Sequence, residues 1–188
     1  MKMIKDKEIL MAAETAGFPL KEAVKDYLIH EGWHVTDVGV QSLDEKDPIM
    51  FHRLGFKVGA MISEGEFEKA IIFCGTGMGI HIGASKCPRV HCAVVESVTA
   101  AKRAVTGNNC NVLSMGAFYI APQLGMQIAD VFLNSKFGEG YEDWENFYEF
   151  HKLAYDEINA FDYEAYKANG FEPIKLGDVE LKHQPYHL

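Results

Sequence analysis

The chain has 188 residues, enough for one domain with a sizeable core, and its formal net charge of −9 argues against nucleic acid or an anionic membrane as a partner. No apolar run approaches the roughly 18–20 residues that span a bilayer, and acidic residues interrupt the N-terminal stretch, so no secretion signal is expected. The cysteines form no CxxC pair and the histidines lack zinc-binding spacing. The sequence therefore predicts a cytoplasmic protein with reduced thiols and no metal site.

Strand-like and helix-like segments alternate along most of the chain. Residues 8–13 form a short apolar run typical of a buried strand, and the helical segment that follows is expected to end at Gly32. Its apolar face comprises Leu20, Val24, Tyr27 and Leu28. Further strands are expected at residues 34–40, 69–75, 90–95 and 111–116, and further helices at residues 50–63, 97–107 and 121–135.

This alternation is the pattern of a parallel sheet covered by helices and joined by right-handed crossovers. We expect about five strands within an α/β domain at residues 1–140. Aromatic and acidic residues mix in residues 138–158, which we expect to form one long helix, and the tail after Gly170 is expected to be irregular. We expect residues 141–188 to belong to the same domain and to lie at a subunit interface, because both faces of the sheet are already covered.

The stretch CGTGMGI carries the strongest chemical signal, because it places the Cys74 thiol at the end of a predicted strand, before three glycines. Ligands of open α/β sheets bind beyond the carboxyl ends of the strands. A helix starting near Met78–Ile80 would present free amides to an oxyanion, with the thiolate beside it as base or nucleophile. The alternative is an ordinary glycine turn with an inert buried cysteine. The loop lacks the lysine of a nucleotide-binding P-loop, and the first strand lacks the dinucleotide fingerprint.

Several other residues have a functional and a structural interpretation. Glu14 ends the first strand and either faces the crevice or caps the next helix, and His81 either contacts a substrate or packs. The remaining cysteines, Cys87, Cys92 and Cys110, are expected to be small buried side chains. Asn109 and Asn111 are expected to turn the chain or touch a ligand. The aromatic stripe of Trp144, Phe147, Tyr148 and Phe150 is interpreted as an interface or core face, with sugar stacking on Trp144 as the alternative.

Three segments, FCGTGMGIHIGASK, VHCAVVES and GNNCNVLSMGAFYIAP, resemble the family of type B ribose-5-phosphate isomerases and galactose-6-phosphate isomerases over roughly residues 8–140. The resemblance implies a Rossmann-like three-layer sandwich, a homodimer or dimer of dimers, and aldose–ketose isomerisation through an enediolate without metal or cofactor. It implies that Cys74 is the proton-transferring base, since Ile80 stands where some members carry a glutamate. It also implies that Asn108 reaches the neighbouring subunit's site. The implied enediolate-stabilising amides are those of Gly75, Thr76, Gly77, Met78 and Gly79.

The chain also departs from the family's pattern. Glu14 and Thr15 stand where the family carries Asp-His, and Gly107 stands where it carries a ring-opening histidine. Phe51, or His52, takes the place of a tyrosine. Tyr141 and Glu145 lie near the places of two phosphate-binding arginines, and an acid there repels phosphate. The cations that could compensate are Arg53, Lys86, Arg89 and Lys102.

These residues predict an aldose–ketose isomerase that acts on a sugar or sugar phosphate other than ribose 5-phosphate, such as a tetrose, another pentose or a sugar acid derivative. Cys74 and Thr76 are the expected catalytic residues. The expected substrate-binding residues are Glu14, Thr15, Gly75, Gly77, Met78, Gly79, His81 and Asn108. The alternative is a non-catalytic sugar-binding or regulatory subunit of the same family, which the missing histidine and arginines favour.

Overall fold

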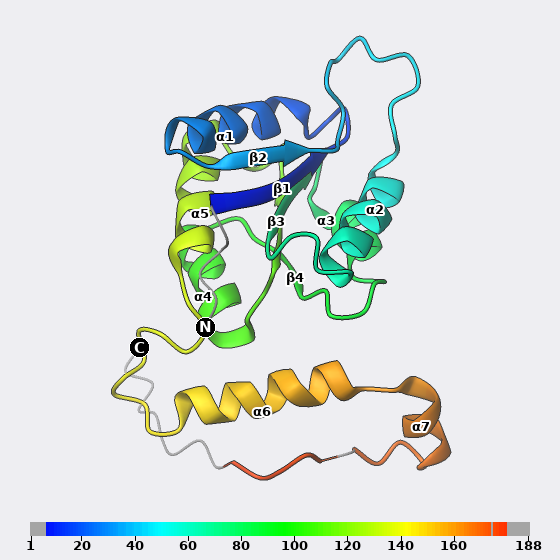
Figure 1. Ribbon diagram of the computed structural model, residues 1–188, viewed down its shortest axis with the longest axis vertical. Helices are drawn as coiled ribbons and strands as arrows, with labels where there is room; N and C mark the ends of the chain where they lie inside the picture. The colour runs from blue at the N-terminus through cyan, green and yellow to red at the C-terminus, as the bar shows by residue number, and fades with distance from the viewer. Residues whose placement is uncertain (1–6, 174, 180–188) are drawn as a thin grey trace.

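A five-stranded parallel sheet forms the centre of the computed structural model, which describes residues 7–173 and 175–179 (Figure 1). The strand order is β2-β1-β3-β5-β4, so the expected parallel sheet of about five strands is confirmed. The strands are β1 (Glu8–Ala13), β2 (His34–Asp37), β3 (Ala70–Cys74), β4 (Cys92–Val94) and β5 (Val112–Gly116). The helices are α1 (Phe18–His30), α2 (Phe51–Ser63), α3 (Met78–Ala84), α4 (Val98–Asn108), α5 (Pro122–Asn134), α6 (Phe147–Ala160) and α7 (Tyr163–Ala168).

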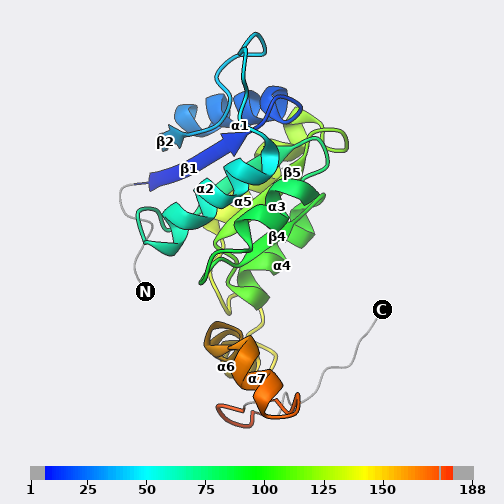
Figure 2. The same cartoon turned by 90° about the vertical axis from the view of Figure 1, so that its right-hand side faces the viewer.

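Helices cover both faces of the sheet, which gives the three layers of the sandwich (Figures 1 and 2). The helices α1, α4 and α5 pack on one face, and α2 and α3 pack on the other. Side chains of β3 alternate between the two cores: Ile71 and Phe73 belong to the first, and Ile72 and Cys74 belong to the second. The continuous apolar character of this strand therefore follows from its burial on both faces.

Helix α1 shows the predicted apolar face and one feature that its periodicity did not indicate. Leu20, Val24 and Leu28 are buried as expected, but Lys21 is fully buried as well. Its Nζ lies 2.5 Å from Oδ2 of Asp37 and donates to the carbonyl of Val40 at 2.6 Å. Burial alone would raise the pKa of Asp37, but hydrogen bonds from Lys21, from the Gly39 amide and from Lys25 hold that pKa below its usual value.

Two predicted helix boundaries are wrong. The long helix expected over residues 138–158 begins only at Phe147, because the preceding segment contains left-handed residues: Gly138 (φ 83°), Gly140 (φ 79°) and Asn146 (φ 65°). The helix expected to end at Gly107 includes that glycine and ends one residue later, at Asn108. Asn109 then turns the chain in a left-handed conformation, as its side-chain type allows.

The helices α6 and α7 form an arm that stands apart from the sandwich and meets it beside α4 (Figures 1 and 2). Within α6 only Phe147 is buried, and apolar side chains such as Ile158 and Phe161 are exposed. A role of this arm at a subunit interface stays a prediction. The described residues after Gly170 form no helix or strand, and the rest of the tail lies outside the described residues. In the part of the chain that the structure describes, no helix is long and apolar enough to cross a bilayer.

Candidate active site

The thiol of Cys74 lies at the carboxyl edge of the sheet, at the end of its central strand. Cys74 is 5% exposed, and its Sγ accepts a hydrogen bond from the amide of Gly77 at 3.1 Å. Gly77 has a φ of 75° and precedes α3, which begins at Met78 as predicted. Its carbonyl accepts a hydrogen bond of 2.5 Å from the hydroxyl of Ser114 on the neighbouring β5. The loop is therefore held against two strands, with an amide directed at the sulfur.

Glu14 joins the end of β1 to this loop. Its carboxylate accepts hydrogen bonds from the amides of Ala16 (2.9 Å) and Gly17 (3.1 Å), which lead into α1. The same carboxylate accepts a bond of 3.1 Å from the amide of Gly75. Glu14 therefore organises the turn before α1 and contacts the loop that carries Cys74, and its role in binding a substrate stays a prediction. Thr15 lies half-buried beside it, and its carbonyl accepts from the Phe18 amide at 3.4 Å.

Three of the five loop amides already have acceptors. The Gly75 amide donates to the carboxylate of Glu14, and the Gly77 amide donates to the sulfur of Cys74. The Met78 amide donates to the Thr76 hydroxyl at 3.3 Å. The Thr76 amide donates to no described residue, and Gly79 lies in the first turn of α3, where amides lack an intrahelical acceptor. Among the described residues, the amides of Thr76 and Gly79 are therefore the loop amides that remain available to a ligand oxygen.

Two phenylalanine rings border the loop and explain two of its glycines. A Cβ atom on Gly75 would lie 2.5 Å from the ring of Phe118, and one on Gly79 would lie 2.5 Å from the ring of Phe51. Phe51, one of the two residues expected at the place of the family's tyrosine, therefore borders the loop. Phe118 is 68% exposed and was not singled out from the sequence, although it follows the end of β5 directly. An apolar wall of this kind suits the non-polar face of a small sugar.

His81 and Asn108 make no side-chain hydrogen bond to the Cys74 loop among the described residues. His81 lies half-buried on α3, where burial lowers its pKa, and its Nδ1 is buried without a hydrogen-bond partner among the described residues. Asn108 is exposed at the end of α4, which leads into the start of β5 at the opposite edge of the sheet. Burial raises the pKa of Cys110 to about 11, which suits the inert role expected of this thiol.

The loop has no cationic side chain of its own. Among residues 7–173 and 175–179, no lysine or arginine donates a hydrogen bond to residues 74–79. Arg89, one of the candidate cations, donates instead to the carbonyl of Ser63. Within the same described ranges, no group of three or more His, Cys, Asp or Glu residues is arranged to hold a metal ion. Among the described residues the site therefore offers a thiol, amide donors and aromatic walls, and no lysine or arginine is hydrogen-bonded to the loop.

Comparison with known proteins agrees with this geometry. Residues 9–146 match the Ribose/Galactose Isomerase family. The chain is 39% identical over 160 residues to a 4-deoxy-4-sulfo-D-erythrose isomerase of Clostridium sp. (strain MSTE9), covering 85% of this chain and 98% of that protein. It is 32% identical to a D-erythrulose-4-phosphate isomerase of Pectobacterium atrosepticum, covering 70% and 86%. A ribose 5-phosphate isomerase structure from Thermotoga maritima superposes with a TM-score of 0.71 at 29% identity, covering 82% and 98%. The chain belongs to the ribose/galactose isomerase family.

Proposed function

We propose that the protein is an aldose–ketose isomerase for a four-carbon sugar with an anionic group at C4, and that Cys74 is its base. The observation that carries the proposal is the position of Cys74: its Sγ lies at the end of β3 and accepts a hydrogen bond from the Gly77 amide at 3.1 Å, in a loop whose Thr76 and Gly79 amides have no acceptor among the described residues. These donors are placed to stabilise negative charge on an oxygen next to the carbon that loses its proton.

The reaction needs no oxidant or reductant. The Cys74 thiolate removes the proton from C2 of the open-chain aldose, and the electron pair of that C–H bond forms the C1–C2 double bond of an enediolate with its charge on O1. The proton of the O2 hydroxyl then moves to O1, and the Cys74 thiol returns its proton to C1. The product is the ketose, and the thiolate is regenerated.

The choice of a four-carbon substrate is supported by two relatives and by one substitution in this chain. The relatives are named for 4-deoxy-4-sulfo-D-erythrose and for D-erythrulose 4-phosphate. A tetrose whose C4 position is sulfonated or phosphorylated lacks the free 4-hydroxyl that closes a five-membered ring. Such a substrate is already open-chain and needs no ring-opening histidine, which agrees with Gly107 at that place in the sequence.

Kinetics on a panel of sugars in deuterated water test this function. We expect 4-deoxy-4-sulfo-D-erythrose or D-erythrose 4-phosphate to be isomerised with kcat/KM of about 10⁴ M⁻¹s⁻¹ or more, with solvent deuterium appearing at C1 of the ketose. D-ribose 5-phosphate should be a poorer substrate. Ribose 5-phosphate as the best substrate would overturn the four-carbon assignment. Absence of both turnover and deuterium exchange on every sugar would favour the rival function, a non-catalytic subunit.

A further inference from the structure

Arg103 of α4 is enclosed by three aromatic rings, which we call the Arg103 cage. Its guanidinium carbon lies 4.7 Å from the ring centre of Tyr141, 5.0 Å from that of Phe147 and 5.9 Å from that of Trp144. The rings of Tyr141 and Phe147 also stack on each other, with centres 4.1 Å apart and planes 11° apart. Aromatic faces attract the charge of a guanidinium and leave the N–H groups at its edge for acceptors lying in its plane.

The edge of this guanidinium lacks an acidic partner. Nη1 is buried and makes no hydrogen bond within the described part of the chain, and Nη2 lies 3.5 Å from Nε2 of His151. No ion pair to Arg103 occurs among the described residues, although Lys21 and Lys25 are both paired with carboxylates. A buried donor without an acceptor carries an energetic cost, because it has lost its hydrogen bond to water. An oxyanion bound at this edge would remove that cost and form a charge-assisted hydrogen bond.

Gly107 provides the space in which Arg103 lies. A Cβ atom on Gly107 would be 3.1 Å from Nε and 3.2 Å from Cζ of Arg103, one helical turn away. A larger residue at 107 would therefore displace the guanidinium. Gly107 stands where the family carries a histidine, and its lack of a side chain leaves space for Arg103. Arg103 was not among the cations considered from the sequence.

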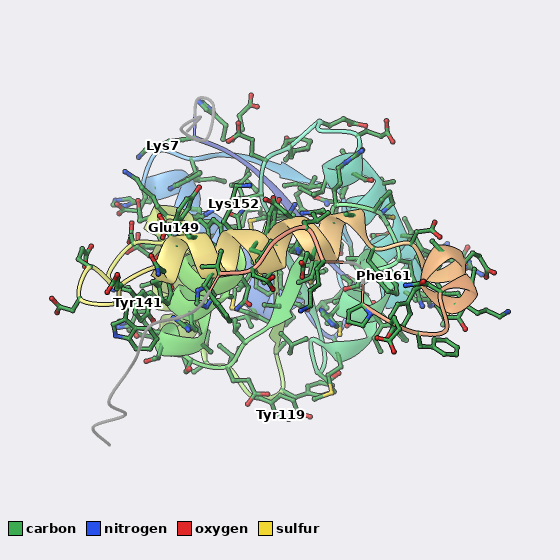
Figure 3. The ribbon with its side chains drawn as sticks, turned by 90° about the horizontal axis from the view of Figure 1, so that it is seen from below. Lys7, Tyr119, Tyr141, Glu149, Lys152 and Phe161 are labelled. Carbon is green, nitrogen blue, oxygen red and sulfur yellow. The ribbon has the colours of Figure 1, made fainter. Side chains whose placement is uncertain are left out.

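Arg103 cannot contact a substrate that is bound at the glycine loop of its own chain. The helix α4 packs on the face of the sheet that carries α1 and α5, whereas Cys74 and α3 belong to the opposite face. Figure 3 shows Tyr141, in the cage, and Tyr119, which follows β5 next to the loop, on different sides of the molecule. An arginine of the Arg103 cage can reach a substrate at this loop only from a second copy of the chain.

We propose that Arg103 of one copy binds the terminal oxyanion, a sulfonate or a phosphate, of the sugar held at the Cys74 loop of a second copy. The inference rests on the proposed function, and it supplies the cation that the loop lacks. Exposed apolar side chains beside the loop, including Met78, Phe118 and Tyr119, offer the surface that a second copy would cover. Nη1 of Arg103 is buried in this structure, so binding of the anion at this atom also requires the surrounding side chains to shift.

Substitution of Arg103 tests its role in binding. Arg103→Met keeps the apolar contact with the rings and removes the charge, and Arg103→Lys keeps a charge without the planar fork. With either anionic tetrose we expect Arg103→Met to raise KM roughly 10–100-fold and to change kcat little, with partial recovery in Arg103→Lys. Inhibition by inorganic sulfate or phosphate should weaken in parallel. The matched control is Lys152→Met, which removes a cation of α6 that pairs with Asp156 at 2.5 Å and should leave the kinetics unchanged.

The outcomes separate this inference from the proposed function. An inactive wild-type protein rejects the proposed function. An active wild type with an unchanged KM in Arg103→Met rejects the role of Arg103 alone. A loss of kcat without a change in KM rejects it as well, because it indicates a structural effect. If Arg103→Met does not fold, as judged by its thermal melting, the same comparison is made with Arg103→Lys.

Mixing two defective variants tests whether the site is shared. In a mixed dimer of Cys74→Ser and Arg103→Met subunits, one site combines the intact Cys74 of one subunit with the intact Arg103 of the other. Random exchange of subunits should therefore restore about a quarter of the wild-type sites at low substrate concentration. No recovery, after subunit exchange has been demonstrated, would mean that Arg103 does not act across the interface and would overturn the proposal.

Discussion

The glycine loop and the Arg103 cage differ in how far apart in the sequence their parts lie. The loop is built from one strand end and the six residues that follow. Its contacts are mainly hydrogen bonds from backbone amides to the side chains of Cys74 and Glu14. The cage joins Arg103 to rings about forty residues later, and its contacts are side chain to side chain. Backbone amides at a strand end serve any enediolate, whereas side chains brought together by packing distinguish one substrate anion from another. We therefore propose that the first region carries out the chemistry common to the family and that the second determines the choice of substrate.

Removal of the Cys74 thiol should have the largest effect on catalysis, and its structural effect should be confined to the loop. Cys74→Ala keeps the Cβ atom and the fold but removes the base, so we expect a loss of about 10²–10⁴ in kcat with little change in substrate binding. Deuterium exchange into the sugar measures the step directly. Cys87→Ala, at a half-buried thiol, is the control and should behave as wild type. Turnover near the wild-type rate in Cys74→Ala would show that another group is the base.

Glu14→Gln tests whether the carboxylate organises the loop. The amide side chain cannot accept bonds on both of its ends, so the amides of Gly75, Ala16 or Gly17 would lose an acceptor. We expect kcat/KM to fall roughly 10–100-fold and the free energy of unfolding to fall by about 1–3 kcal/mol. Glu31→Gln, at an exposed position, provides the control. Wild-type kcat/KM in Glu14→Gln would mean that the loop holds its shape without this contact.

Alanine substitutions at two glycines with positive φ distinguish the effect of backbone strain on stability from the effect of close packing. Gly65 has a φ of 76° with no atom within 4 Å of an added Cβ, and Gly77 has a φ of 75° with the Gly116 nitrogen at 3.0 Å. Gly65→Ala should lower the free energy of unfolding by about 1 kcal/mol, from strain alone. Gly77→Ala should lower it by about 1 kcal/mol more, because the neighbouring strand must also shift. Urea unfolding measures both, and equal losses would show that the loop can move away from β5.

At the opposite edge of the sheet, Lys69 should give a small dependence of stability on pH. It lies just before β3, donates to the Phe132 carbonyl at 2.7 Å, and burial lowers its pKa to about 8. Above that pH the folded state loses the proton while the unfolded state, with a pKa near 10.5, still holds it, so stability increases with pH. Relative to Lys69→Met, the wild type should gain roughly 1 kcal/mol between pH 8 and pH 9. Parallel stability curves for the two proteins would contradict the lowered pKa.

The sequence alone determined the alternation of strands and helices, the burial of β3 on both faces and the position of Cys74 before a helix start. These features depend on neighbours within a few residues, because burial repeats with the period of a strand or a helix and because glycines mark the turn. It also indicated both departures that matter for the substrate, Gly107 and the loss of two arginines. Local patterns also made the predicted helix that corresponds to α6 too long at its start. Side-chain periodicity does not reveal that Asn146 has a left-handed backbone conformation.

Only the tertiary structure decided which distant groups meet. Glu14 reaches the Gly75 amide because β1 and β3 are neighbours in the sheet, although 61 residues separate them. Lys21 is buried because Asp37, at the end of β2, faces it. Arg103 lies among aromatic rings because the chain turns back beside α4 at residues 138–146. Each of these contacts depends on the order of strands and on the path of the arm, which local periodicity does not encode, so the position of Cys74 at a strand end could be predicted and the Arg103 cage could not.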